Sequence, residues 1–306
     1  MLRLMMLLTV TFPFLLSAAE PGSAAYTSHP LGSTKAPYGF IEHLPYPATN
    51  AASKTVYPLV FFLHGHGELG DSNVDLPQLA KHGPFKHLVA GDAIGKMLEQ
   101  NRAIVIAPQG LKSDSWFRPE QVLATLAYVV ATYPVDKSRI YVTGLSMGGG
   151  GTWALCMTIP EQIAAAVPIC GAGNVSSEVP KLRGIPLWTY HSIDDSVVKF
   201  PLTSQAWYDQ ILPSLGVKRN GGVMGGVELS GKTWTGTVVG KDAGKEWKWT
   251  EGEVPAGKLE TSTLNLTVYP NGGHDSWSRA YANPAMWTWM FAQKKKSVSG
   301  QLPLKP

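Results

Sequence analysis

The distribution of apolar residues along the chain predicts a series of short buried strands. A nearly continuous apolar run extends from Leu59 to Leu63. Similar runs occur in the segments RAIVIAPQG, RIYVTG, IAAAVPICG, IPLWTYHS and LNLTVYP. Apolar runs without alternation are typical of strands covered on both faces, as in a parallel sheet. The alternating segment YGFIEHLP predicts one further strand, which ends at a proline.

Longer stretches with helix-like composition separate these runs. They read PEQVLATLAYVVATY, GGGTWALCMTIP, TSQAWYDQILPSLG and PAMWTWMFAQKKK. Because strands and helices alternate, the pattern predicts an α/β protein with a mostly parallel, doubly wound sheet and helices on both of its faces.

One region, residues 218–263, interrupts this alternation. It is rich in glycine and lysine and contains Trp234, Trp247 and Trp249. Its segments TWTGTVV and KEWKWTEG alternate like the strands of a small hairpin. We expect an insertion that decorates the sheet, in which the tryptophans either cover the insertion's own small core or contact a ligand.

The N-terminal residues have the pattern of an export signal. Arg3 precedes the apolar segment LMMLLTVTFPFLL, and the small residues SAA follow at positions 17–19. The apolar run is short against the roughly 20 residues that span a bilayer. We therefore expect a signal peptide over residues 1–19 and a secreted or periplasmic protein. A loose segment over 20–37, one domain over 38–296 and a tail over 297–306 complete the expected organisation.

Composition and charge narrow the classes of partner. Hydrophobic residues make up 44% of the chain and charged residues 16%, which indicates a globular protein with a sizeable core. The net charge is only +4, and the single basic run is Lys294 to Lys296. Since no basic stripe is present, we expect no nucleic-acid binding. The short N-terminal apolar run likewise leads us to expect no stable membrane insertion.

The two cysteines, Cys156 and Cys170, are expected to be free and buried. If the predicted helix begins near Gly148, Cys156 lies about 12 Å along it, away from the sheet edge at which the helix begins. The next strand runs back to that edge and ends with Cys170. A disulfide requires Cα atoms within about 7 Å. A disulfide between them stays the less favoured alternative.

The strongest local motif lies where the segment RIYVTG meets a predicted helix. Residues 144–148 read GLSMG, which is the G-x-S-x-G pattern in the strand, turn and helix context that gives it meaning. Such a turn exposes the serine, here Ser146, as a nucleophile. The glycine row 148–151 also suggests a phosphate loop, but no lysine follows it as that loop requires. We expect the extra glycines to let the helix pack closely on the sheet.

A serine nucleophile needs a base and an acid that orients the base. Asp194 and Asp195 follow one predicted strand, and His274 follows the last one, in the order serine, acid, histidine. Both loops come after strand C-termini, where α/β sheets place their functional groups. His191, just before the aspartates, is a candidate to orient the acid.

The segment FLHGHGELG, residues 62–70, follows the first buried strand. A developing oxyanion needs backbone N–H donors, and in such folds one comes from this loop and one from the residue after the serine. This nominates the amides of His66 and Met147. The alternative, a metal site formed by His64 and His66, lacks a further ligand at suitable spacing, so we expect no metal and no cofactor.

Together, these motifs resemble secreted α/β-hydrolase esterases of the polyhydroxybutyrate-depolymerase-like, feruloyl-esterase-like and "predicted peptidase" group. The motifs are PLVFFLHGHGELGDSN, IAPQG with Trp116, GLSMGG, HSIDDSVV and GGHDSWSRAY, and the similarity covers roughly residues 38–293 apart from the insertion. The resemblance implies the α/β-hydrolase fold, with Ser146 and His274 as nucleophile and base. The family's acid motif, H-G-x-x-D-x-x-V, selects Asp195. Because Ser192 replaces its glycine, Asp194 stays an alternative.

The resemblance also implies a substrate class. Members of the group hydrolyse carboxylic esters, often acyl groups on plant polysaccharides, so we expect a small-molecule, polysaccharide or short polyester substrate. A peptidase using the same residues and a non-catalytic carbohydrate-binding protein are the alternatives. Trp116 and Trp277 lie in loops at the edge that carries these residues, where they either wall the substrate or pack beneath the loops. The oligomeric state stays open.

Overall fold

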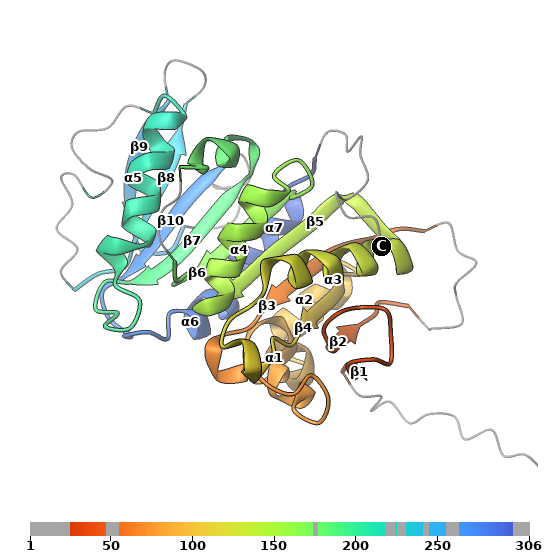
Figure 1. The fold of residues 1–306 in the computed structure, drawn as a ribbon. Coiled ribbons are helices and arrows are strands. Elements are labelled where there is room, and N and C mark those ends of the chain that lie inside the picture. Colours follow the sequence, from red (N-terminus) through yellow and green to blue (C-terminus); the bar gives the residue numbers. More distant parts are fainter. Residues whose placement is uncertain are drawn as a thin grey trace, which may run out of the picture.

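The computed structural model describes residues 25–46, 55–173, 177–217, 224, 231–240, 245–254 and 263–295. Its centre is a ten-stranded sheet with the order β1-β2-β4-β3-β5-β6-β7-β10-β8-β9 (Figure 1). The strands are β1 (Thr27–His29), β2 (Phe40–His43), β3 (Tyr57–Leu63), β4 (Ile104–Pro108), β5 (Val135–Leu145), β6 (Ala165–Ile169), β7 (Leu187–Ser192), β8 (Trp234–Val239), β9 (Glu246–Glu251) and β10 (Leu264–Tyr269).

The six central strands, from β4 to β10 in the sheet order, run parallel. The outer strands β1 and β2 on one side and β8 and β9 on the other are antiparallel. Every residue of β3, β4, β6, β7 and β10 is buried. The prediction of a mostly parallel sheet from unalternating apolar runs is therefore confirmed.

Helices cover both faces of this sheet. They are α1 (Gly83–Ala90), α2 (Ala93–Gln100), α3 (Pro119–Thr132), α4 (Met147–Thr158), α5 (Ser204–Ser214), α6 (Trp277–Ala282) and α7 (Pro284–Ala292). Leu59 and Phe61 of β3 join a cluster with α3, α4 and α5, whereas Val60 and Phe62 join one with α1, α2, α6 and α7. Figure 1 shows α3, α4 and α5 in front of the sheet. Successive side chains of one buried strand therefore point to opposite faces of the sheet, and helices cover both faces.

Two local expectations were wrong or incomplete. Residues 27–29, expected to be loose, form β1 and pair antiparallel with β2, and Ala36 is buried. An edge strand pairs through its backbone, so the polar, proline-rich composition of this segment did not reveal it. The helices α1 and α2 were not predicted either, because they are only eight residues long each.

The region 218–263 extends the sheet. Its strand β8 pairs with β10, and β9 pairs with β8, as the predicted hairpin. The ring of Trp247 lies 5.8 Å from that of Tyr208 in α5 and covers Gly236. Trp234, Trp247 and Trp249 all pack against the core on the α5 side. These contacts favour the packing interpretation of the tryptophans over ligand contact.

Several sequence expectations concern residues outside the described part, among them the signal peptide over 1–19 and the tail over 297–306. Among the described residues, no helix has the length and apolar character needed to cross a membrane. Cys156 and Cys170 are both free and buried, as expected.

The glycine row at the start of α4 is a packing requirement. A Cβ on Gly149 would lie 2.6 Å from the carbonyl oxygen of Ile169, and one on Gly150 would lie 2.3 Å from that of Ala172. These contacts are with backbone, which cannot rotate away. The expectation that the extra glycines let the helix approach the sheet is confirmed.

We predict that Gly149→Ala lowers the free energy of unfolding by about 1–3 kcal/mol, the usual cost of overpacking, despite the better helix propensity of alanine. Urea unfolding followed by circular dichroism measures the change. Gly184→Ala is the matched control, because a Cβ there meets no atom within 4 Å. Equal stability of the two variants would contradict the packing argument.

Candidate active site

Ser146 occupies a strained turn between β5 and α4. Its backbone has φ 52° and ψ −115°, in the left-handed half of conformational space that non-glycine residues rarely adopt. A Cβ on Gly148 would lie 2.0 Å from the carbonyl oxygen of Leu63, and one on Gly144 would lie 2.3 Å from that of Gly148. Both glycines of the G-x-S-x-G motif are therefore sterically required.

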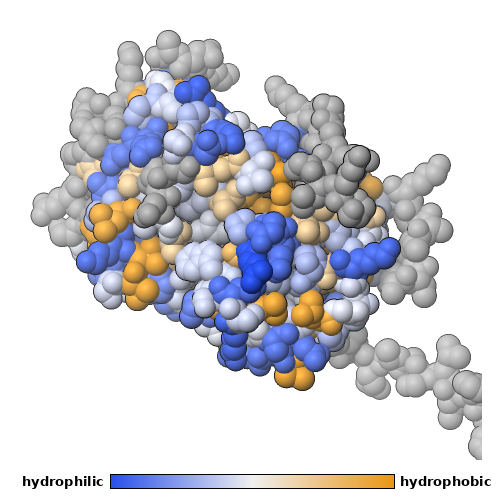
Figure 2. Space-filling model, in the orientation of Figure 1, coloured by the Kyte–Doolittle hydropathy of each residue, from blue (hydrophilic) through white to orange (hydrophobic). Residues whose placement is uncertain are grey.

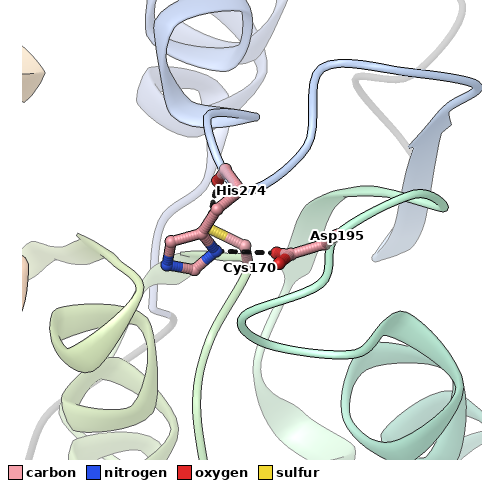
Figure 3. A group of neighbouring side chains, drawn as sticks. All are labelled: Cys170, Asp195 and His274. Atoms are coloured by element: carbon pink, nitrogen blue, oxygen red, sulfur yellow. Dashed lines mark hydrogen bonds and ion pairs between the residues drawn. The ribbon is translucent and has the colours of Figure 1, made fainter.

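The side chains of Ser146, His274 and Asp195 form a hydrogen-bonded series. The Ser146 Oγ lies 2.8 Å from His274 Nε2, and His274 Nδ1 lies 2.7 Å from Asp195 Oδ2. Figure 3 shows the His274 ring directed at Asp195. The side chain of Asp195 is completely buried, whereas that of His274 is 19% exposed. The arrangement holds an imidazole between a carboxylate and a hydroxyl, as nucleophilic catalysis requires.

Asp195 stays ionised in this buried position. Burial alone would raise its pKa, but hydrogen bonds from His191, His274 and the backbone amides of Val198 and Val197 outweigh burial and lower the pKa to about 2. Both amides donate to Asp195 Oδ1 over 2.9 Å. The carboxylate is thus fixed in position and charge.

His191 supports the acid, as its position in the sequence suggested. Its Nε2 lies 2.7 Å from the carbonyl oxygen of Val198, to which it donates, and 3.2 Å from Asp195 Oδ2. Its Nδ1 lies 2.7 Å from the Ser204 hydroxyl. The ring is completely buried. Its contact with Oδ2 therefore helps to hold the Asp195 side chain in a fixed position.

Asp194 has a different place. Its carboxylate accepts hydrogen bonds from the amides of Gly272 and Gly273, over 3.3 Å and 2.9 Å. These residues immediately precede His274, so Asp194 fastens the histidine loop and does not contact the ring. Of the two aspartates that the sequence left open, the structure brings Asp195 to His274.

The loop after β3 lies against the serine turn. A Cβ on Gly65 would meet the Leu145 side chain at 2.6 Å, and the Gly65 amide donates to Glu68 Oε2 over 3.0 Å. Within the described residues, the amides of His66 and Met147 have no hydrogen-bond acceptor. Neither predicted oxyanion donor is therefore occupied by another group in the described part of the chain.

His64 has a structural position. Its Nδ1 donates to the Gly65 carbonyl over 2.6 Å, and its Nε2 accepts from the Gly110 amide over 2.9 Å. Burial lowers its pKa to about 4, so the ring is neutral at physiological pH. Since both nitrogens are engaged, the alternative of a metal site at His64 and His66 gains no support.

The two predicted substrate-contact tryptophans differ. The Trp277 ring packs edge-on against His274, with centroids 5.2 Å apart, and also against His82 at 5.7 Å. Trp116 is 43% exposed and lies beside Gly150 of α4. Trp277 thus packs against the histidine ring, whereas the Trp116 side chain is exposed to solvent.

Sequence reasoning missed the pair Glu68 and His82. The carboxylate of Glu68 lies 3.7 Å from His82 Nε2, and burial raises its pKa. Glu68 accepts a hydrogen bond from the Gly65 amide in the loop after β3. It also lies next to His82, whose ring packs against Trp277. These contacts connect the loop after β3 with the His274 loop. No local sequence pattern indicates this contact, because His82 starts a helix that was not predicted.

Cys170 was also not singled out as part of this site. It lies with Asp195 and His274 in one group (Figure 3), and its thiol donates to the His274 carbonyl over 3.5 Å. Burial raises the pKa of this thiol to about 12, whereas a metal ligand needs a thiolate. Both nitrogens of His274 already have partners. The group is therefore poorly suited to bind a metal, and Cys170 braces the histidine loop.

Comparison with known proteins finds esterases among the proteins similar to this chain. No family model matches the chain. A segment is 30% identical over 92 residues to the bifunctional acetylxylan esterase/xylanase XynS20E of Neocallimastix patriciarum, covering 30% of this chain and 13% of that protein. The chain therefore spans only a small part of this curated relative.

Solved structures give wider coverage. A thermostable esterase superposes with a TM-score of 0.60 at 25% identity, over 88% of this chain and 62% of its own. An acetyl xylan esterase from Aspergillus awamori gives 0.54 at 15% identity, over 87% and 99%. The S-formylglutathione hydrolase FrmB of Staphylococcus aureus gives 0.51 at 15% identity, over 86% and 96%. The chain has the α/β-hydrolase fold, and it is similar in sequence and structure to esterases of that group.

Proposed function

We propose that the protein is a serine carboxylic-ester hydrolase. The observation that carries this proposal is the series of contacts from Ser146 Oγ to His274 Nε2 at 2.8 Å and from His274 Nδ1 to Asp195 at 2.7 Å, at a strained turn. The similarity to esterases over most of the chain supports the reaction class.

In the proposed mechanism, Ser146 attacks the ester carbonyl while His274 takes its proton. The ionised Asp195 stabilises the imidazolium that forms. The amides of His66 and Met147 hold the developing oxyanion, and the protonated histidine then donates to the leaving alcohol. Water activated by the same histidine releases the acid from Ser146. No step requires a metal or a cofactor.

The proposed substrates are acyl esters of polysaccharides or smaller esters with similar acyl groups. The similarity to a bifunctional acetylxylan esterase/xylanase and to an acetyl xylan esterase supports this class. Polymeric substrates outside the cell fit the export signal over residues 1–19, so secretion or periplasmic location belongs to the proposal. Trp116, which is exposed beside α4, is the proposed substrate contact, and Trp277 acts through His274.

Ser146→Ala is expected to lower kcat/KM for p-nitrophenyl acetate at least about 1,000-fold, because no other group can form the acyl-enzyme. Initial rates at pH 7 measure the effect. Ser33→Ala is the control, since the Ser33 side chain contacts only a nearby exposed carbonyl. Activity of Ser146→Ala within a few-fold of the parent would reject the mechanism.

Two further assays on the parent protein separate the alternative functions. Faster cleavage of a chromogenic peptide than of the ester would favour a peptidase. Failure of the folded protein to react with a fluorophosphonate probe at Ser146 would favour a non-catalytic binding protein.

The two aspartates give a second prediction. Asp195→Asn is expected to lower kcat/KM about 1,000- to 10,000-fold, because the amide neither stabilises the imidazolium nor fixes its tautomer. Asp194→Asn keeps an oxygen for the amides of Gly272 and Gly273 and is expected to cost less than about tenfold. Ester kinetics on both variants measure the contrast, and a larger loss in Asp194→Asn would reverse the assignment.

A further inference from the structure

Gln109 follows β4 directly and is completely buried, although glutamine is usually an exposed residue. On the face shown in Figure 2, hydrophilic side chains lie at the surface and apolar ones reach it in small groups among them. A buried polar side chain is stable only where its hydrogen-bonding groups have partners. The partners of Gln109 therefore show what this buried side chain holds in place.

The side-chain amide of Gln109 binds the loop that follows β3. Its Nε2 donates to the carbonyl oxygens of Glu68 and Asp75, each over 3.0 Å. Its Oε1 accepts from the Ser72 amide over 2.8 Å. All three partners lie between residues 68 and 75, whereas Gln109 comes from the end of the neighbouring parallel strand. The side chain thus fastens the loop after β3 to the end of β4.

Two further features show how closely this loop fits Gln109. A Cβ on Gly70 would lie 2.3 Å from Gln109 Nε2, so a side chain at position 70 would displace the amide. Ser72 has φ 56°, which non-glycine residues rarely adopt, and its hydroxyl donates to the Gln109 carbonyl over 2.6 Å. The contacts with Gln109 therefore hold the loop in a conformation that is unfavourable by itself.

Backbone contacts lead from Gln109 to the amide of His66. The Glu68 carbonyl accepts from Gln109, and the Glu68 amide donates to the Gly65 carbonyl over 3.2 Å. The carbonyl of Gly65 and the N–H of His66 belong to one planar trans peptide, so they point in opposite directions. The position of Glu68 therefore determines where the His66 N–H points.

The same loop lies against the serine turn. A Cβ on Gly148 would lie 2.0 Å from the carbonyl oxygen of Leu63 and 2.6 Å from that of His64. Gly148 is only two residues after Ser146. A shift of the loop therefore changes the position of the His66 amide relative to the nucleophile.

We propose that Gln109 is a positioning residue for the reaction at Ser146, and that its side-chain amide holds the turn His66–Glu68 so that the His66 N–H faces the oxyanion. This inference rests on the proposed ester hydrolysis, in which that N–H is one of two oxyanion donors. Gln109 acts through the turn rather than on the substrate itself. Loss of one oxyanion donor typically lowers kcat about 100- to 1,000-fold, so displacement of the turn is expected to slow the reaction strongly.

Gln109→Met tests the proposal, because it keeps the length of the side chain and removes its three hydrogen bonds. We expect kcat/KM for p-nitrophenyl acetate to fall about 100-fold in this variant. Gln162→Met is the matched control, since Gln162 is also buried but donates to the adjacent Glu161, beyond the far end of α4. It is expected to keep kcat/KM within about threefold of the parent.

An oxyanion mimic gives a readout that a purely structural role would not change. Trifluoroacetophenone adds to a serine hydroxyl: the bond from Ser146 Oγ to the carbonyl carbon forms, His274 takes the proton, and the ketone oxygen becomes the oxyanion. Fluorine NMR measures the dissociation constant of this adduct. The constant is expected to rise at least about tenfold in Gln109→Met and to change less than about threefold in Gln162→Met.

The adduct forms without turnover, so the two proposals can fail separately. A parent that forms the adduct but hydrolyses no ester overturns the proposed function, and the adduct still tests Gln109. The positioning role is overturned if Gln109→Met keeps the parent's dissociation constant, if Gln162→Met changes it equally, or if the folded parent forms no adduct.

Thermal unfolding checks that the variants are folded. If Gln109→Met is not, Gly70→Ala replaces it, because its Cβ displaces the Gln109 amide and removes no hydrogen-bonding group. The same rise in the dissociation constant is expected from Gly70→Ala, and an unchanged constant in that variant overturns the proposal.

Discussion

The sharp turn at Ser146 is the constraint on which the rest of the site depends. A serine with φ 52° is unfavourable by itself, so the surrounding structure must impose it. The Ser146 amide donates to the carbonyl of Ile169 in β6, and its own carbonyl accepts the amides of Gly150 and Ala172. These bonds tie the turn to α4 and to the neighbouring strand. The close approach of helix and strands then excludes any Cβ at Gly144 and Gly148.

The parallel sheet supplies the other groups from separate loops. Because β3, β5, β7 and β10 run in the same direction, the loops that follow them meet at one edge. Each loop is fixed by contacts of its own: Glu68 holds the amide of Gly65, His191 holds Asp195, and Asp194 holds the residues before His274. Catalytic geometry in such a site depends on these supporting contacts as much as on the reacting groups.

Much of this arrangement could be predicted from the sequence, because it follows from local pattern. The central strands were evident as apolar runs, and the motif around Ser146 was meaningful because a strand precedes it and a helix follows. Cys170, His82 and Glu68 could not be assigned in the same way. Their roles arise from contacts with residues far away in the chain, such as the 3.5 Å contact of Cys170 with the His274 carbonyl. The edge strand β1 was missed for a related reason, since its pairing is carried by the backbone.

Detection of the acyl-enzyme tests the central claim most directly. The protein is mixed with p-nitrophenyl acetate, quenched in acid during the first turnover, digested and analysed by mass spectrometry. The account predicts an acetyl group on the peptide that contains Ser146, appearing with the first release of p-nitrophenol. Release of p-nitrophenol in the first turnover with the acetyl group on another residue, or with none on Ser146, would contradict it.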